Sequence, residues 1–235
     1  MDGRARPPGR SSSRTVLLMQ EAPSRLLPLF GTPVMVERWS EADEMGPQLL
    51  DIIEQHRATH PSVSLSNIHG WQSQTDMLVW GGEAARRLVE HVLKRCDEFT
   101  VDIRERERRR FEWLPEMWAN VNEHGASNQT HCHPGSQWSA VYYVKDGYGG
   151  SEDDALGGEL VFLDPRVPMI RMREPDLRSR TRDGSPEHQE SWMRPKTGQL
   201  VIFPAWLMHS VRPYFGKELR VSIAINISSR PSWGP

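Results

Sequence analysis

Hydrophobic residues recur with a helical period in the first half of the chain and in short strand-like runs in the second half. Two segments, 43–57 and 82–99, carry apolar residues at every third or fourth position, which predicts amphipathic helices packed on one side of a sheet. From residue 111 onward, short apolar runs alternate with Gly, Pro, Asn and Asp, a pattern typical of strands and turns. We expect these strands at 117–121, 138–144, 159–162, 199–203, 210–213 and 219–227.

Strands at this spacing, with no clear helix between them, predict an antiparallel sandwich or jelly roll. The chain is therefore predicted to be mainly β with N-terminal helices, as a single domain over 16–235. Its helical part is expected at about 28–110 and its jelly-roll core at about 111–228. Residues 1–15, rich in Arg, Gly, Pro and Ser, predict a disordered tail. The charged stretch at about 165–195 is unusually long for a loop, so it is either a lid over a site or a mobile surface excursion.

Composition and charge exclude several classes of protein. A formal net charge of −2 over 235 residues argues against a nucleic-acid binder, which needs a concentrated excess of Lys and Arg. No stretch approaches the ~20 apolar residues that span a bilayer. Only Cys96 and Cys132 are present, so no disulfide framework is expected and a reducing cytoplasm fits. We expect a cytoplasmic protein that acts on a small molecule, without nucleic acid or membrane, and a homodimer is a candidate assembly.

Three histidines form the strongest candidate for chemistry. His131 and His133 are two residues apart among turn-forming residues, which places the pair at a strand end and on one face. His209 follows a buried, strand-like run and a bend that contains Pro204. A sandwich brings such strand ends together, and converging imidazoles bind metal ions. We predict a metal site at these three residues and expect the other histidines to be surface or cap residues.

Arg220 predicts an anion site beside the metal. On the strand at 219–227, Arg220, Ser222 and Ala224 share one face, and a guanidinium on a core strand is costly unless it is paired. The sequence offers no obvious acidic partner, which favours a ligand carboxylate, with Ser222 as an added donor. Pairing with an acid of a neighbouring strand is the alternative. Asn128 is the best placed of the nearby Asn residues to reach this site.

Other polar and aromatic residues near the predicted site carry weaker signals. Trp138 and Trp206 are candidates to line a substrate pocket, although core packing is the default for tryptophan. Arg212 is expected to contact either substrate or a surface acid. Asn120 and Asn122 are expected to be turn or cap residues.

Several short motifs follow one another in an order that resembles a known family. They are a Gly-Trp-Gln-Ser element at 70–73, His131-x-His133, the run at 139–144, Gly-Gly-Glu-Leu at 157–160, the Pro-to-His run at 195–209, and Arg220-x-Ser222. Together they resemble the iron(II)/2-oxoglutarate-dependent oxygenases, and in particular a bacterial group that also carries the Gly-Trp-Gln-Ser element.

The resemblance implies a double-stranded β-helix, a cupin-like jelly roll, buttressed by helices. It also implies an oxidoreductase: a dioxygenase that uses Fe(II), 2-oxoglutarate and O2 and releases succinate and CO2. Hydroxylation of an unactivated C–H bond of a small molecule or biosynthetic intermediate is the default outcome. In this reading Arg220 holds the distal carboxylate of 2-oxoglutarate, assisted by Tyr143 and Ser222.

The chain departs from the usual His-x-Asp/Glu…His metal motif of these enzymes. His133 stands where the carboxylate is expected, and three interpretations remain open. An all-nitrogen triad of His131, His133 and His209 is one. In another, His133 is the first ligand and Gly135 occupies the carboxylate position, as in halogenating relatives. In the third, a different residue such as Gln137 completes the set. Beside a halogenase-like or oxidative-cyclising enzyme, a cupin-like isomerase or small-molecule-binding protein is the alternative function.

Overall fold

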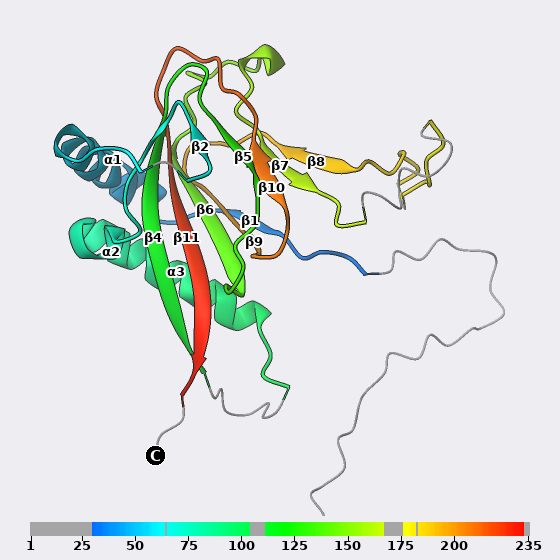
Figure 1. The fold of residues 1–235 in the computed structure, drawn as a ribbon, viewed down its shortest axis with the longest axis horizontal. Helices are drawn as coiled ribbons and strands as arrows, with labels where there is room; N and C mark the ends of the chain where they lie inside the picture. The colour runs from blue at the N-terminus through cyan, green and yellow to red at the C-terminus, as the bar shows by residue number, and fades with distance from the viewer. Residues whose placement is uncertain (1–29, 64, 104–110, 167–175, 182, 233–235) are drawn as a thin grey trace, which may run out of the picture.

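The computed structural model describes residues 30–63, 65–103, 111–166, 176–181 and 183–232. These residues form two antiparallel sheets, with helices against the outer face of one of them (Figure 1). The six-stranded sheet has the order β1-β9-β6-β11-β4-β3, and the five-stranded sheet has the order β2-β5-β10-β7-β8. Non-consecutive neighbours in both sheets show that the strands cross between them, as in a jelly roll.

The helices are α1 (Ala42–Thr59), α2 (Met77–Trp80) and α3 (Gly82–Phe99). The larger sheet consists of β1 (Met35–Arg38), β9 (Gln199–Pro204), β6 (Trp138–Lys145), β11 (Arg220–Pro231), β4 (Phe111–Asn122) and β3 (Trp71–Gln72). The smaller sheet consists of β2 (Asn67–Ile68), β5 (Ser127–His131), β10 (His209–Val211), β7 (Leu160–Leu163) and β8 (Glu190–Met193). A short 3₁₀ turn, Asp154–Leu156, precedes β7.

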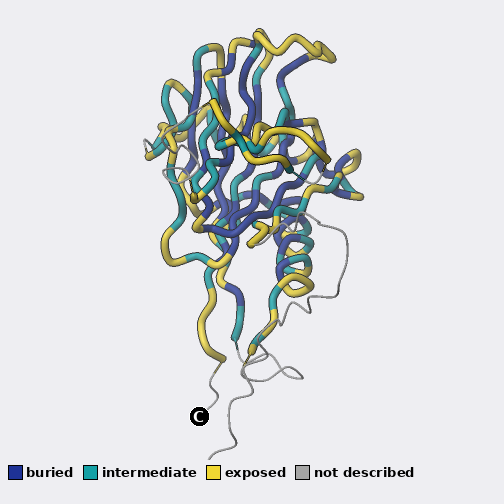
Figure 2. The backbone as a smooth tube through the Cα atoms, turned by 90° about the vertical axis from the view of Figure 1, so that its right-hand side faces the viewer, coloured by how far each residue is buried: buried dark blue, intermediate teal, exposed yellow. Residues whose placement is uncertain are grey.

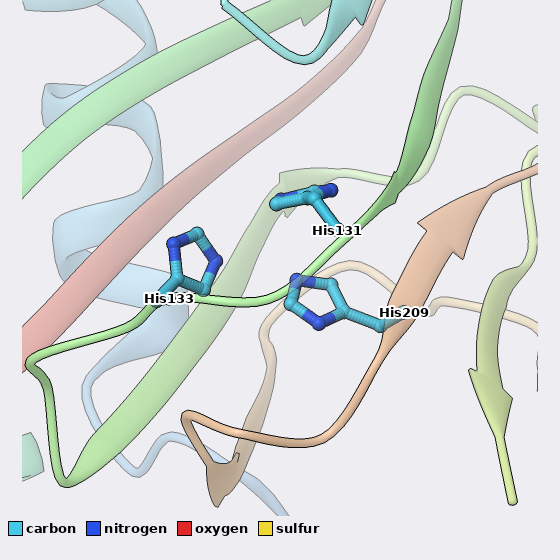
Figure 3. A group of neighbouring side chains, drawn as sticks. All are labelled: His131, His133 and His209. Carbon is cyan, nitrogen blue, oxygen red and sulfur yellow. The ribbon is translucent and has the colours of Figure 1, made fainter. Parts of the chain in front are cut away.

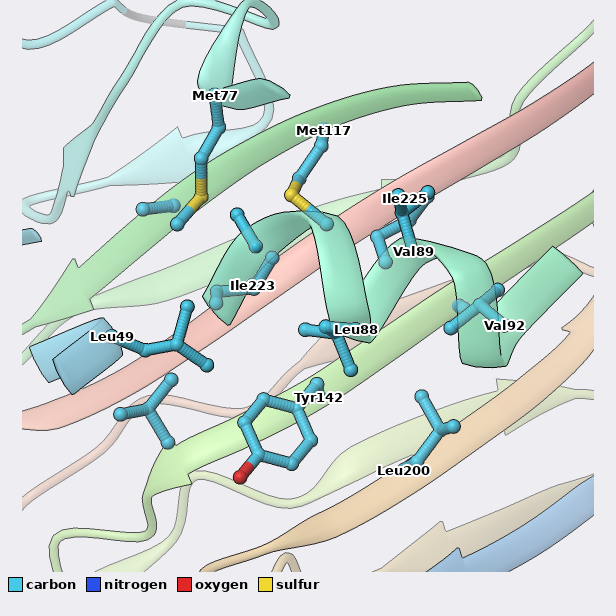
Figure 4. Close-up of a cluster of buried hydrophobic side chains, with 14 of the residues drawn as sticks. Leu49, Met77, Leu88, Val89, Val92, Met117, Tyr142, Leu200, Ile223 and Ile225 are labelled. Atoms are coloured by element: carbon cyan, nitrogen blue, oxygen red, sulfur yellow. The ribbon is translucent and has the colours of Figure 1, made fainter. Parts of the chain in front are cut away.

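The main hydrophobic core lies between the helices and the larger sheet. Leu49 of α1, Leu88 of α3 and Ile223 of β11 are fully buried in one cluster (Figure 4). Full burial of one such side chain stabilises the fold by about 1.5–3 kcal/mol. The helices therefore anchor this sheet on one face and leave its opposite face to form a site.

Strand β11 shows how the period of two divides these faces. Val221, Ile223 and Ile225 belong to the core under the helices. Arg220 and Ser222 point the other way and line a pocket between the sheets. The same alternation applies in the neighbouring strand β6, so the larger sheet has one apolar face and one partly polar face.

A second, smaller cluster fills part of the space between the sheets. It contains Phe162 and Leu160 of β7 together with Val201 and Phe203 of β9. Figure 2 shows that the buried segments run through the middle of both sheets, whereas connecting loops and one side of the helix in view are exposed. The pocket described below opens beside this cluster.

The predicted fold class is confirmed: the structure is mainly β, with helices packed on one side of a sheet. The helix predicted at 82–99 has these bounds in the structure, and the one predicted at 43–57 is α1. The hydrophobic pattern did not predict strands β5 and β8. Strand β5 reads Ser-Asn-Gln-Thr-His and has no hydrophobic alternation, because its side chains face a polar pocket or solvent.

The stretch at 165–195 is only partly described. Its end forms β8, which pairs with β7 along Leu160↔Met193 to Leu163↔Glu190 and so extends the smaller sheet. Residues 167–175, like the tail predicted at 1–15, lie outside the described ranges. The lid and the mobile excursion therefore both stay predictions, as does the division of the chain into parts.

Membrane-spanning helices were not expected from the sequence. Among the described residues, no helix has both the length and the apolar composition to cross a bilayer.

Candidate metal centre

Strands β5 and β10 bring two of the three histidines together. They pair antiparallel, with His131 directly opposite His209. Side chains directly opposite in such a pair lie on the same face, about 4.5–5.5 Å apart at Cβ. The two ring centroids are 4.4 Å apart. The unpredicted strand β5 is therefore what places His131 beside His209.

His133 joins the pair from a loop just beyond β5. Its backbone N–H donates to the Ala205 carbonyl over 2.9 Å, which ties the loop to the end of β9. Its ring centroid lies 4.9 Å from that of His131 and 5.1 Å from that of His209. Figure 3 shows the three rings directed toward one another. Nitrogen atoms of all three lie within 4.8 Å of one another, a separation that a single metal ion can bridge.

Backbone carbonyls fix two of the rings. Nδ1 of His131 lies 2.7 Å from the Gln129 carbonyl oxygen, and Nδ1 of His209 lies 2.8 Å from that of Leu207. A carbonyl only accepts hydrogen bonds, so each Nδ1 carries the proton and donates. The lone pair of each neutral ring is then on Nε2, which is the arrangement of most metal-binding histidines.

Burial keeps the two more enclosed rings neutral. Burial lowers the pKa of His209 to about 3, although the hydrogen bond to Leu207 acts in the opposite direction. Burial, together with the nearby His131, lowers the pKa of His133 to about 4. A metal ion needs the neutral form of imidazole, so these two ligand candidates are available at neutral pH without loss of a proton.

A buried cation closes the other end of the same pocket. Arg220 is 1% exposed, and its Nε atom has no hydrogen-bond partner within the described ranges. The guanidinium carbon lies 5.1 Å from the centre of the Tyr143 ring. The Tyr143 hydroxyl is also buried and makes no well-oriented hydrogen bond in this part of the chain; burial raises its pKa, although the charge of Arg220 and a side-chain contact with it act in the opposite direction. Two buried donors without protein acceptors thus point to an anionic ligand.

Other residues predicted for cosubstrate binding also line the pocket. Ser222 follows Arg220 on the same face of β11 and is 4% exposed. Asn128 lies on the opposite wall in β5, where its amide donates to the Ser66 hydroxyl over 3.3 Å. Its donors are therefore partly engaged, in contrast to those of Tyr143 and Arg220.

Asn120 is a pocket residue that sequence reasoning missed. Asn120 and Asn122 were expected in turns or caps, but both lie within β4. Asn120 is opposite Ser222 in the β4–β11 pairing, lines the pocket, and has a buried amide oxygen without a partner among the described residues. Because Asn120 shares the strand face of Trp118, period-two alternation along the predicted strand was the signal that could have found it.

The three residues predicted for the substrate pocket do not line this one. Trp138 faces the helices, where its Nε1 donates to the Thr100 hydroxyl over 2.9 Å. Its neighbour Ser139 takes the pocket face of β6, so alternation explains the difference. Trp206 is 54% exposed in the turn after β9. Arg212 donates to Glu159 over 3.1 Å; it therefore pairs with an acid, but with a buried one that is 5% exposed and not with the surface acid of the sequence prediction.

Two alternative ligand positions also lie outside the pocket. Gly135 and Gln137 are exposed and do not contribute to its lining. Within the described ranges, His131, His133 and His209 form the group of His, Cys, Asp or Glu side chains close enough to share a metal ion.

The sequence of this region matches a family model. Residues 116–226 match the family described as "Putative 2OG-Fe(II) oxygenase". The matched span contains all three histidines, Tyr143 and Arg220. This segment, just under half of the chain, is similar to the 2OG-Fe(II) oxygenase family. The match agrees with the oxidoreductase class and with the cofactors Fe(II) and 2-oxoglutarate that the sequence motifs predicted.

Solved structures support the oxygenase fold. The chain is similar to a prolyl-4-hydroxylase from Pseudomonas putida, with 18% identity, coverage of 85% of this chain and 94% of that one, and a TM-score of 0.54. It is similar to the non-heme alpha-ketoglutarate-dependent epimerase SnoN of nogalamycin biosynthesis, with 14% identity, 86% and 80% coverage, and a TM-score of 0.57. It is also similar to HygX from Streptomyces hygroscopicus, solved with nickel and 2-oxoglutarate, with 12% identity, coverage of 84% of this chain and 83% of that one, and a TM-score of 0.53. No curated protein matches the sequence.

Proposed function

We propose that this oxygenase binds Fe(II) through His131, His133 and His209 and hydroxylates an unactivated C–H bond of a small molecule. The observation that carries the proposal is the convergence of three imidazoles in the same pocket as the buried Arg220, whose Nε has no hydrogen-bond partner among the described residues. A cation site and an anion site side by side suit a cosubstrate that chelates the metal at one end and carries a carboxylate at the other. When bound, iron with 2-oxoglutarate and O2 supplies the oxidising power for the reaction.

The donor sets fit both groups. Imidazole nitrogen suits Fe(II), and three such ligands leave coordination positions for the cosubstrate and oxygen. The guanidinium of Arg220 binds a carboxylate, and the hydroxyls of Tyr143 and Ser222 add donors beside it. Each of these donors is at least 96% buried, so water competes little for the carboxylate. We assign the far carboxylate of 2-oxoglutarate to these three residues, with the amides of Asn128 and Asn120 on the adjoining walls.

An apolar wall beside the histidines supports oxidation of a C–H bond. The Phe203 ring centroid lies 4.8 Å from that of His209, and Leu160 lines the same pocket. Apolar side chains hold a hydrocarbon group and exclude water from the reacting position. The chain's own contribution is to bind and orient substrate there.

Anaerobic titrations test the binding site. Fe(II) and then 2-oxoglutarate are added to the protein, and calorimetry and the visible charge-transfer band report binding. We expect one Fe(II) per chain and a band that requires both additions. His209→Ala should lose Fe(II) binding, whereas His124→Ala, on a histidine that contacts Phe215 outside the pocket, should keep it. Absence of Fe(II) binding by the unmodified protein would overturn the proposal.

Turnover tests the chemistry. With Fe(II), 2-oxoglutarate and O2, we expect slow release of succinate, which a true substrate accelerates. Small-molecule candidates are screened for that acceleration, and the product is examined by mass spectrometry for the gain of one oxygen atom from 18O2. A product that lacks the added oxygen would contradict hydroxylation while leaving the oxygenase assignment intact.

A further inference from the structure

Asn226 on β11 is a polar residue whose contacts are not explained by cosubstrate binding. It follows Arg220, Ser222 and Ala224 on the pocket face of the strand, between the fully buried Ile225 and Ile227. Its side chain lies next to His133, which occupies the position of the usual carboxylate. An amide at this point contacts a candidate ligand directly.

Asn226 connects His133 to a buried serine. The amide nitrogen of Asn226 lies 3.0 Å from Nδ1 of His133, and its amide oxygen accepts from the Ser139 hydroxyl over 2.9 Å. Ser139 is 2% exposed and lies opposite Asn226 in the β6–β11 pairing. The order of contacts is therefore Ser139, Asn226, His133.

This contact distinguishes His133 from the other two histidines. Carbonyl oxygens require a proton on Nδ1 of His131 and His209, so their tautomers are fixed. An amide can either donate or accept. In the orientation above it donates to Nδ1 of His133, so the neutral ring carries its proton on Nε2, where it blocks metal binding. A half-turn of the amide exchanges its oxygen and nitrogen, and the oxygen then accepts from a protonated Nδ1.

The serine permits both orientations. A hydroxyl donates to the amide oxygen in one case and accepts from the amide nitrogen in the other, so no buried group loses its partner when the amide turns. An imidazole binds metal only in the tautomer whose metal-facing nitrogen carries no proton, whereas the carboxylate of the usual motif has no such tautomers. The substitution of His for an acid at position 133 thus creates a requirement that Asn226 and Ser139 can meet.

We propose that Asn226, supported by Ser139, is a positioning residue that selects the metal-binding tautomer of His133 by turning its amide when metal enters. The inference rests on the proposed function, because it assumes that His133 is a ligand. Loss of such a partner typically lowers metal affinity by about 10–100-fold. We expect a loss of this size on removal of the amide.

The test uses Zn(II), a redox-inactive probe, with the full-length protein and the variants Asn226→Leu and Asn226→Asp. Asn226→Leu keeps the size but removes all hydrogen bonding, so Zn(II) affinity should fall about 10–100-fold. The carboxylate in Asn226→Asp only accepts, so it should favour protonated Nδ1 and retain or exceed the original affinity. Asn122→Leu is the matched control, because it removes a buried amide of β4 that does not line the pocket, and it should leave Zn(II) affinity unchanged.

Imidazole 15N chemical shifts provide a readout independent of affinity. We expect the protonated nitrogen of His133 to change from Nε2 to Nδ1 when Zn(II) binds, and to be Nδ1 already in metal-free Asn226→Asp. Signals of His131 and His209 should keep a protonated Nδ1 in every variant. Two results would overturn this inference and leave the proposed function standing, provided that the unmodified protein binds Zn(II). One is an unchanged Zn(II) affinity in Asn226→Leu, and the other is a His133 ring whose protonated nitrogen does not change when Zn(II) binds. Failure of the unmodified protein to bind metal would overturn both.

Discussion

Replacement of Arg220 by methionine should make the metal-free protein more stable and at the same time weaken its binding of 2-oxoglutarate. Arg220 is 1% exposed, and its Nε has no partner among the described residues. Methionine has a similar unbranched length and no charge. The substitution therefore removes a buried cation while filling most of the same space.

The magnitude follows from the contacts of Arg220. A buried charge without a partner costs roughly 3–5 kcal/mol. Its position over the Tyr143 ring, 5.1 Å from guanidinium carbon to ring centre, recovers about 0.5–2 kcal/mol. The difference between these two contributions is the expected gain, so Arg220→Met should raise the free energy of unfolding by about 1–4 kcal/mol. Loss of a charged hydrogen bond to the carboxylate costs about 1.5–3 kcal/mol of binding, or roughly 10–150-fold in Kd.

Urea denaturation of the metal-free proteins measures the first effect, and anaerobic calorimetry with Fe(II) and 2-oxoglutarate measures the second. Arg212→Met is the control, because Arg212 is paired with Glu159 and lies outside the pocket. It should leave the Kd for 2-oxoglutarate unchanged and gain no stability. If Arg220→Met destabilised the metal-free protein, Arg220 would have a stabilising partner in the fold and the carboxylate assignment would lose its physical basis.

Three further predictions concern the histidines. His209→Ala should abolish both Fe(II) binding and succinate release, measured by calorimetry and chromatography, because it removes a ligand from the most buried side of the site. His133→Asp restores the common carboxylate and should retain Fe(II) binding, whereas His133→Ala should lose it; full activity of the alanine variant would refute a ligand role. In the metal-free protein, the pKa values of His133 and His209 are lowered to about 4 and about 3 from 6.5. The unfolded state therefore binds more protons below pH 6.5, and stability should fall as the pH drops from 6.5 toward 3. Urea unfolding at several pH values measures the slope, and it should be shallower in His209→Gln.

Hydrophobic periodicity predicted the parts of the fold whose burial is one-sided. The helix at 82–99 buries one face, and the strand at 219–227 alternates between the core and the pocket, so both carry a clear period. The same alternation on β11 predicted that Arg220 and Ser222 share a face. The local hydrophobic pattern predicts burial here because the position of a residue along its own helix or strand determines which face it lies on.

Strands and contacts that depend on distant segments were not visible in the sequence. Strand β5 has almost no apolar residues, and its pairing with β10 alone decides that His131 lies opposite His209. Trp138 was predicted to be a candidate for the lining of a substrate pocket near the metal. Because neighbouring residues of a strand face opposite sides of the sheet, Trp138 packs under the helices, whereas Ser139 lines the pocket.

The sequence by itself determined which chemistry was available: three histidines, an arginine on a core strand, and a motif order typical of 2OG-Fe(II) oxygenases. The tertiary structure decided which of these groups meet and what their neighbours are. Asn226 illustrates the difference, because 93 residues separate it from His133 and only the pairing of β11 with β6 brings it near the metal site. Hydrogen bonds over such separations depend on register and direction in three dimensions, which residue types along a chain do not encode locally.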